Sequence, residues 1–318
     1  MEQQPQIYPD LREGFNTYWE KNLCPLLKSK EKLRKKYVAR FWCLLLLALF
    51  VLPAVTIGIY VFNKYFQKNI DSGLFFIVLA VFIFLLRQPF KSYKKRMKND
   101  TMQTFINYFK GFTYEQGKGL SLEEIDKSHI FPSADIIEAD DCFEGSFQDV
   151  RIRVCEQIFK NIQRTKRGKK EVVVFQGIAV ELAMNKNFQG QTVVLKDSGF
   201  FNRFKGLSGF ERIRLEDPQF EKLFEVYGTD QVEARYLLTP VFMERIIKLK
   251  DLYKSKSIQL SFHDNNVLIA VKTKEDMFEP YSFFKTNLNK QKIDRVFEQF
   301  LTVFSIVDIL KLAQKVNL

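Results

Sequence analysis

Residues 41–63 read FWCLLLLALFVLPAVTIGIYVFN, and none of these 23 positions has a charged side chain. A helix of this length rises about 34 Å, which is enough to cross a hydrocarbon core of about 30 Å. A core helix of a soluble protein needs only one apolar stripe, whereas this stretch is apolar on every side. Many charged residues precede it, so it lacks the layout of a secretory signal peptide. We therefore predict a transmembrane helix over residues 41–63.

A second apolar run, SGLFFIVLAVFIFLL, occupies residues 72–86. Its 15 uncharged positions reach about 22 Å, which is short of a full span. Arg87 can extend its charged end to the membrane surface, and residues 88–90 can add another turn. We predict a second span over residues 72–90, with a re-entrant or interfacial segment as the alternative. The two runs together would form a transmembrane hairpin over residues 41–90 that acts as an anchor.

Ala54 and Gly58 form a small-xxx-small pair inside the first run. Such pairs let two helices approach closely. Because these pairs also arise often by chance, we expect this one to serve packing within the hairpin rather than a dedicated dimer.

The basic residues of the chain are concentrated around the hairpin. The chain has 49 Lys+Arg and 37 Asp+Glu, a net charge of +12. Residues 1–118 contain 19 basic and 8 acidic side chains, whereas residues 119–318 contain 30 and 29. A nucleic-acid-binding domain usually shows a basic face on its own folded surface. The nearly neutral C-terminal part therefore argues against nucleic acid as a partner. The lipid bilayer remains as the expected partner of the basic residues.

The positions of these charges also predict the orientation. Lysines and arginines crowd before the first run and after the second, while the connecting loop has only Lys64 and Lys68 beside Asp71. By the positive-inside rule, both termini of a multi-pass membrane protein with these charges face the cytoplasm. Cys142 and Cys155 show no disulfide or CxxC pattern, which agrees with a reducing compartment.

Four regions follow from these patterns. Residues 1–40 are predicted as an N-terminal cytoplasmic helix, amphipathic and basic, with Leu11, Phe15, Tyr18, Trp19 and Leu23 at helical spacing. Residues 41–90 form the hairpin. Residues 91–130 are predicted as a helical connector, in which the helical period runs through Phe112 and Ser121 and Glu124 match a capping box. Residues 131–318 are predicted as a cytoplasmic domain.

The cytoplasmic domain is predicted to be α+β with an antiparallel sheet and packed helices. Strand patterns lie at residues 150–154, 171–184, 191–196, 212–215, 257–263 and 267–273. Asp217–Pro218, with Phe220 and Phe224 on one face, and Thr239–Pro240 are typical helix starts. Asp230 with Glu233 matches a further capping box, and residues 291–313 match a final helix. Because the strands cluster and the helices stand apart, this pattern differs from βαβ alternation.

No catalytic or cofactor motif accompanies this fold. The sequence lacks GxxxxGK[ST], GxGxxG after a strand, HExxH and GxSxG, so we expect no cofactor, and two isolated histidines leave little for a metal site. The acidic pairs Glu123/Glu124 and Asp140/Asp141 are interpreted as a capped helix face and a turn. These patterns favour a non-catalytic module that binds a protein partner, itself or the inner leaflet. An enzyme with an unrecognised site, acting on a lipid or nucleotide at the membrane face, is the alternative.

Several motifs of the domain resemble a known family. They include FQG at residues 175–177, FQGQT at 188–192, EDPQFE at 216–221, FEVY at 224–227 and EARYLLTP at 233–240. Over residues 135–285 the chain resembles the bacterial domain of unknown function three-one-three-seven (DUF3137). Its members are typically two-span membrane proteins with a cytoplasmic domain, so the resemblance implies that topology and a location in the bacterial inner (plasma) membrane. It implies no catalytic residues.

Two features of the domain are candidate binding sites. Residues 164–170 place the most concentrated charge of the domain on a hairpin turn, with Gly168 suited to a positive φ. A solvated hairpin tip is the favoured interpretation, and contact with anionic headgroups is the alternative for Arg164, Lys166, Arg167, Lys169 and Lys170. Arg235 lies in an otherwise apolar helix. We expect it to pair with a buried carboxylate such as Glu216 or Glu221, with an anion or partner groove as the alternative.

Overall fold

The computed structural model describes residues 8–66, 73–165, 168–196, 209–253, 257–273, 276–310 and 312. Within it the chain divides into two compact units. One unit, the helical unit, consists of residues 10–108 and 279–294. The other, the sheet unit, consists of residues 1–9, 109–278 and 295–318. Each unit is considered by itself.

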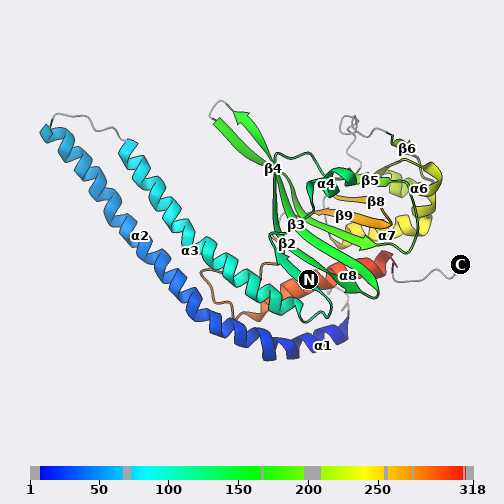
Figure 1. Ribbon diagram of the computed structural model, residues 1–318, viewed down its shortest axis with the longest axis horizontal. Helices are drawn as coiled ribbons and strands as arrows, with labels where there is room; N and C mark the ends of the chain where they lie inside the picture. Colours follow the sequence, from blue (N-terminus) through cyan, green and yellow to red (C-terminus); the bar gives the residue numbers. More distant parts are fainter. Residues whose placement is uncertain are drawn as a thin grey trace. The chain divides into compact units, whose positions relative to one another are not determined.

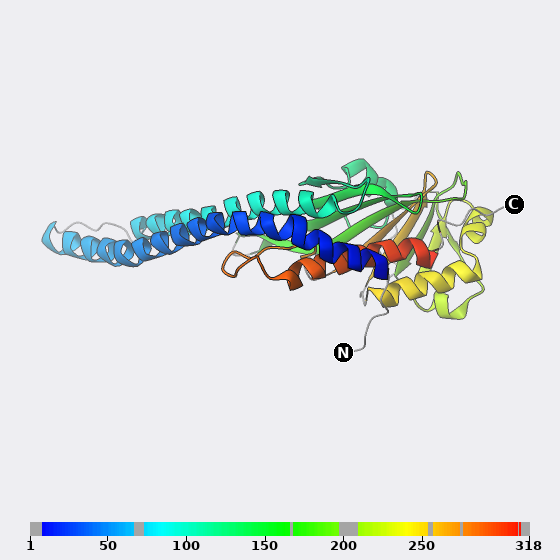
Figure 2. The same ribbon diagram turned by 90° about the horizontal axis from the view of Figure 1, so that it is seen from below.

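The helical unit is built from two long antiparallel helices that lie side by side (Figures 1 and 2). The first begins as α1 (Pro9–Tyr18), passes through a π-helical turn, η1 (Trp19–Leu23), and continues as α2 (Cys24–Phe66). The second is α3 (Gly73–Ile106). Both are long and apolar enough to cross a membrane. In the most apolar 18-residue stretch of each, only 6% and 11% of the residues are buried. A core helix of a soluble protein would be mostly buried, so these helices are candidate membrane spans.

The predicted amphipathic helix near the N-terminus is present and packs on α3. Phe15, Trp19 and Leu23 are buried along one face of α1 and η1. The ring of Phe15 lies 5.7 Å from that of Phe105 and 5.2 Å from that of Tyr108. This face is therefore covered by the end of α3.

Among its described residues, the sheet unit contains one sheet of nine strands, and every neighbouring pair in it is antiparallel. The strand order is β1-β2-β3-β4-β9-β8-β5-β7-β6. The strands are β1 (Thr113–Gln116), β2 (Ile136–Phe147), β3 (Val150–Thr165), β4 (Gly168–Ala183), β5 (Thr192–Lys196), β6 (Glu211–Ile213), β7 (Phe224–Gly228), β8 (Ile258–His263) and β9 (Asn266–Lys272). The predicted α+β class with an antiparallel sheet is confirmed.

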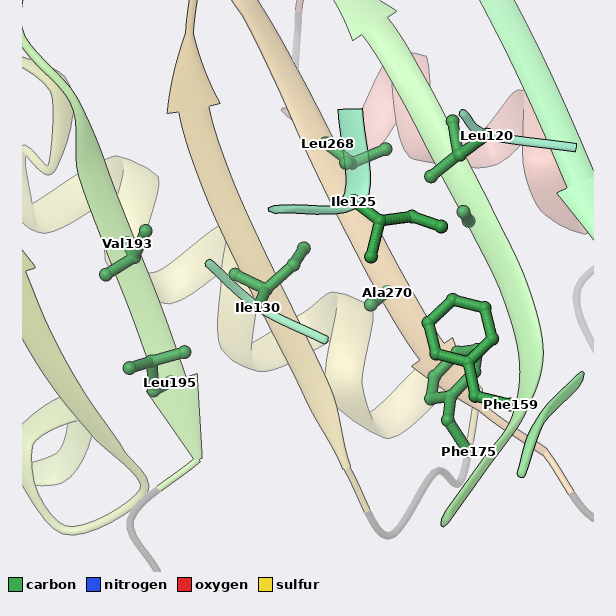
Figure 3. Packing of buried hydrophobic residues seen from close by; sticks show 10 residues of the cluster. Leu120, Ile125, Ile130, Phe159, Phe175, Val193, Leu195, Leu268 and Ala270 are labelled. Carbon is green, nitrogen blue, oxygen red and sulfur yellow. The ribbon is translucent and has the colours of Figure 1, made fainter. Parts of the chain in front are cut away.

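Helices cover both faces of this sheet. The helices of the unit are α4 (Leu122–Ser128), α5 (Pro218–Glu221), α6 (Gln231–Leu237), α7 (Pro240–Leu252) and α8 (Lys290–Leu310), of which the first five residues count with the helical unit. On one face, Ile125 of α4 packs with Phe159, Phe175 and other apolar side chains from alternate strand positions (Figure 3). On the other face, Phe143 lies 4.7 Å from Phe300 of α8. At the start of β3, Val150, Ile152 and Val154 are buried while Arg151 and Arg153 point to the opposite face, which gives the period-two pattern.

Three aromatic positions predicted as helical have other structures. The predicted helix through Phe112 is too long, because α3 ends at Ile106. Gly111 then adopts a φ of +82° and β1 follows, so residues 91–130 are not wholly helical. Phe109 and Phe112 are buried against α8 instead, with Phe109 ring centroids 5.5 Å from Phe300. Phe224 was expected on the helix after Asp217 but begins β7, because α5 has only four residues.

Most predicted helix starts are confirmed in detail. Ser121 and Glu124 form a reciprocal capping box. Asp217 accepts hydrogen bonds from the backbone of Gln219 and Phe220, and Thr239 caps α7. At α6 the capping box is incomplete. Asp230 caps the helix, but the Glu233 carboxylate accepts the backbone N–H groups of residues 189 and 190.

Cys142 and Cys155 form a disulfide, contrary to the expectation from their spacing. They are direct partners in the β2–β3 register, with Cα atoms 4.1 Å apart. Antiparallel pairing brings facing residues to about 4.5–5.5 Å in any case. The sheet register therefore places the two sulfurs together, which no sequence spacing rule reveals.

Candidate functional site

The apolar helices expose the surface expected of a membrane anchor. Large side chains such as Leu49, Phe50 and Phe84 are 61–72% exposed. Ala54 and Gly58 are exposed as well, and a Cβ added at Gly58 would meet nothing within 4 Å. The small pair therefore takes no part in packing α2 on α3. The hairpin packs through other positions, and Ala54 and Gly58 face outward.

A loop far along the chain docks where the apolar runs end. This loop, residues 279–289, is called here the docking loop, and it belongs to the helical unit. Arg34 of α2 is 8% exposed, donates from Nε and Nη2 to the Glu31 carboxylate, and donates from Nη1 to the Phe283 carbonyl at 3.0 Å. The Tyr93 hydroxyl of α3 donates to the Ser282 carbonyl and accepts from the Asn287 amide. Both long helices thus hold the same loop.

An ion pair fixes the beginning of the docking loop. The ammonium group of Lys98 is fully buried, and its Nζ lies 2.8 Å from Oε1 of Glu279. Lys94, one turn earlier on α3, reaches the same oxygen at 3.2 Å. Because a buried ammonium is costly without a counter-charge, Glu279 has a specific structural role.

Aromatic rings fill the space between the docking loop and the helices. The ring of Phe283 lies 5.2 Å from that of Phe90 and 6.0 Å from that of Phe41. Phe284 lies 5.4 Å from Phe41. Phe283 is 4% exposed, whereas Phe284 is 56% exposed. One phenylalanine therefore anchors the loop while its neighbour faces outward.

The predicted basic hairpin tip is present where β3 ends and β4 begins. Arg164 and Lys169 are direct cross-strand partners, and Gly168 has the expected positive φ, +120°. Arg164, Lys169 and Lys170 are exposed, whereas Lys166 and Arg167 lie outside the described residues. The last residues of β3 and the first residues of β4 pair only with each other and extend beyond the rest of the sheet (Figure 1).

The interpretation of Arg235 as a buried ion pair is wrong. Its side chain is exposed, because Ala234 and Leu237 take the buried face of α6. Its guanidinium donates to the carbonyl and the side chain of Gln231 and to the Arg214 carbonyl, at 3.3–3.4 Å. Neither Glu216 nor Glu221 contacts it among the described hydrogen bonds, and Glu221 instead accepts from the Leu215 backbone.

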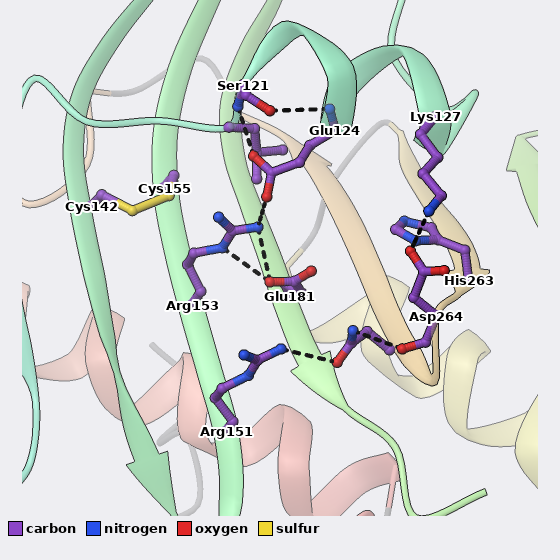
Figure 4. A network of polar contacts seen from close by, with 12 residues as sticks. Ser121, Glu124, Lys127, Cys142, Arg151, Arg153, Cys155, Glu181, His263 and Asp264 are labelled. Atoms are coloured by element: carbon purple, nitrogen blue, oxygen red, sulfur yellow. Dashed lines mark hydrogen bonds and ion pairs between the residues drawn. A yellow bond between two sulfur atoms is a disulfide. The ribbon is translucent and has the colours of Figure 1, made fainter. Parts of the chain in front are cut away.

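A charged network ties α4 to the sheet (Figure 4). Arg153 of β3 pairs with Glu124 at the start of α4 and, at 2.9 Å, with Glu181 of β4. Burial acts to raise the pKa of Glu124, but the hydrogen bonds from Arg153 and Ser121 outweigh it and leave this pKa below its usual value. The contacts are all internal, so this network stabilises the fold.

Three carboxylates lie close together beside β2 and β3. Oxygens of Asp140, Glu156 and Asp276 lie within 4.8 Å of one another. Glu156 is buried and accepts the Met277 backbone N–H at 2.7 Å. Asp140 lies in β2, not in the expected turn, and a bulge between Ala139 and Cys142 interrupts the pairing there. Such a group could hold a cation, but acidic groups often gather without one, and no spacing rule applied to the sequence indicates it.

Comparison with known proteins agrees with the resemblance seen in the sequence. Residues 173–312 match the family described as "Protein of unknown function (DUF3137)". The DUF3137 region begins within β4 and ends just after α8, so it omits the long helices and the first three strands.

One solved structure is similar at a low level. It is the crystal structure of the mycobacterial trehalose monomycolate transport factor A, TtfA, with 11% sequence identity over 68% of this chain and 97% of that chain. The TM-score is 0.35. Among curated proteins, none matches this chain.

Proposed function

We propose that this chain is a membrane-anchored, non-catalytic interaction module of the bacterial inner membrane, and that its β3–β4 tip binds anionic lipids of the inner leaflet. The observation that carries the proposal is the tip itself. Its strands extend past the sheet, and all of its described basic residues are exposed. Juxtamembrane Lys and Arg residues near an anionic surface each contribute about 1 kcal/mol of attraction. A protein partner, including a second copy of this chain, is the competing candidate for binding to the tip.

The proposed orientation places both termini in the cytoplasm and rests on the charge distribution around the hairpin. The Cys142–Cys155 bond is typical of oxidising compartments. Because the register alone brings these two residues together, they would also be neighbours as free thiols. A reporter fused after Leu318 tests the orientation, since activity on the outer side of the membrane would overturn it.

Lipid binding by the tip is tested on the full chain in nanodiscs. A fluorophore is attached at Thr165→Cys, with the free cysteines Cys24 and Cys43 changed to Ser. We expect a lipid-borne quencher to reach the label in nanodiscs with phosphatidylglycerol but not in those with phosphatidylcholine alone. The R164Q/K169Q/K170Q variant should lose this quenching.

The matched control neutralises three exposed basic residues elsewhere in the sheet unit, Arg214, Arg235 and Lys248. It should leave the quenching unchanged. Equal quenching in both lipids, or equal loss in both variants, would refute headgroup binding by the tip. Photocrosslinking from the tip to a protein without any lipid contact would also refute it, in favour of a protein partner. The enzymatic alternative stays a prediction that these contacts do not test.

A further inference from the structure

The docking loop lies at the level where the membrane spans begin. Phe41 is the first residue of the uncharged run of α2, and Phe90 is the last residue before the basic segment of α3. The rings of both contact the pair Phe283 and Phe284. A loop held by these two residues is at the bilayer surface whenever the apolar runs are inside the bilayer. This step rests on membrane anchoring and is independent of lipid binding by the β3–β4 tip.

The exposed apolar groups of the docking loop are held in place rather than left on a loose end. Phe284 is 56% exposed and Leu288 is 37% exposed. Between them, Asn287 is 2% exposed and binds both Tyr93 and the Ser282 backbone. Phe283 is fixed beneath them by Phe41 and Phe90. Phe284 therefore points outward from a loop that hydrogen bonds and ring contacts hold in place.

The charges around the docking loop suit an anionic membrane surface. Lys285, next to Phe284, is exposed, as are Arg40 on α2 and Lys91 on α3. Aromatic rings beside lysine and arginine are typical of the headgroup region of a bilayer. Trp42, whose ring lies 5.8 Å from Phe41, is itself 51% exposed, so the apolar surface continues from the docking loop onto the span.

From these observations we infer that the docking loop is a third membrane contact, which inserts Phe284 and Leu288 into the boundary between headgroups and acyl chains. The bilayer is the occupant because this apolar surface is continuous with the lipid-facing surface of α2. Burial of a phenylalanine ring in an apolar environment is favourable, so insertion of Phe284 would stabilise the docking loop on the bilayer.

The test uses single-tryptophan variants of the full chain in nanodiscs with lipids brominated at shallow or deep positions. The W19F/W42F background removes both native tryptophans. Phe284→Trp, or Leu288→Trp if the first variant misfolds, should be quenched most strongly by shallow bromines. Asn22→Trp is the matched control, because Asn22 is exposed on the same continuous helix, roughly 28 Å before Phe41. It should be quenched by aqueous acrylamide but not by brominated lipid.

The W19F variant alone retains Trp42 and reports on the anchor. Quenching of Trp42 together with Phe284→Trp by brominated lipid supports the inference. If Trp42 is quenched but Phe284→Trp and Leu288→Trp behave like Asn22→Trp, the docking loop does not contact the bilayer and the inference is overturned. If Trp42 is not quenched either, membrane anchoring itself is wrong, and the inference falls with it.

Discussion

Replacing Glu279 by Ala should loosen the docking loop far more than replacing Lys98 by Met, although both changes remove the same ion pair. The Lys98 side chain is fully buried, whereas the Glu279 side chain is 20% exposed. Glu279→Ala leaves a buried ammonium without the carboxylate that faces it at 2.8 Å. Lys98→Met fills the same space with an apolar chain and leaves a partly hydrated carboxylate that Lys94 still reaches at 3.2 Å.

The expected magnitudes follow from this asymmetry. Removing one partner of a buried ion pair costs about 3–5 kcal/mol, and solvent access to Glu279 places Glu279→Ala near the lower end of that range. Lys98→Met should lower the stability of the loop by about 1 kcal/mol, because the remaining Glu279 carboxylate is partly exposed and resembles one partner of a surface ion pair. The difference of about 2 kcal/mol corresponds to roughly a thirty-fold difference in local opening.

Hydrogen exchange of the full chain in nanodiscs measures this opening at the Ser282 amide, which donates to Asn287 within the loop. Lys248→Met is a suitable control, because Lys248 and its partner Glu244 are both 64% exposed and this pair should contribute little. Equal loss of protection in Glu279→Ala and Lys98→Met, or a larger loss in Lys98→Met, would refute the reasoning.

Three further predictions concern the sheet unit, each measured by urea unfolding of the full chain in detergent micelles. The pKa of Glu124 is held below its usual value of 4.5, so the stability from its pairing with Arg153 is present above that value and is lost as pH falls through the lowered one. Arg153→Met should therefore be most destabilising near neutral pH, and a penalty that grew on acidification would contradict the assignment. Gly177→Ala should cost about 3 kcal/mol, because its Cβ would lie 2.0 Å from a backbone carbonyl of β9, whereas Gly58→Ala meets open space and should be nearly neutral. Asp217→Ala should cost about 1 kcal/mol through loss of the α5 cap, and Asp217→Asn should restore most of it.

Local signals in the sequence predicted those parts of the fold that local physics determines. The apolar runs, the Ser121–Glu124 capping box and the Thr239–Pro240 helix start depend on residues within one or two turns, and all are present. The period-two start of β3 was equally readable, because successive side chains point to opposite faces of the sheet and only one of these faces is apolar there.

Local signals misled wherever a distant segment competed. The helical spacing of Phe109 and Phe112 belongs to a loop, because the apolar face of α8 buries them there. Glu233 has the spacing of a capping box, but two backbone amides from the chain preceding β5 bind it instead. Arg235 was expected to be buried, but a helix of seven residues has room for only one buried face.

The docking loop and the carboxylate group had no sequence signature at all. Phe283 meets Phe41 across more than 200 positions of sequence, and Glu156 meets Asp276 across 120. Only the tertiary arrangement brings such residues together, and neither pair matches a spacing rule that can be applied to the sequence alone.

The two-sided attachment of the docking loop restricts how the long helices can move. Arg34 holds the loop from α2, and Tyr93 and Lys98 hold it from α3. Sliding one helix along the other by a single turn, 5.4 Å, would pull Arg34 away from the Phe283 carbonyl or Tyr93 away from Ser282. Axial piston motion is therefore blocked unless the loop first detaches. Pivoting of both helices as one body keeps all of these bonds, so tilting is the motion that this hairpin permits.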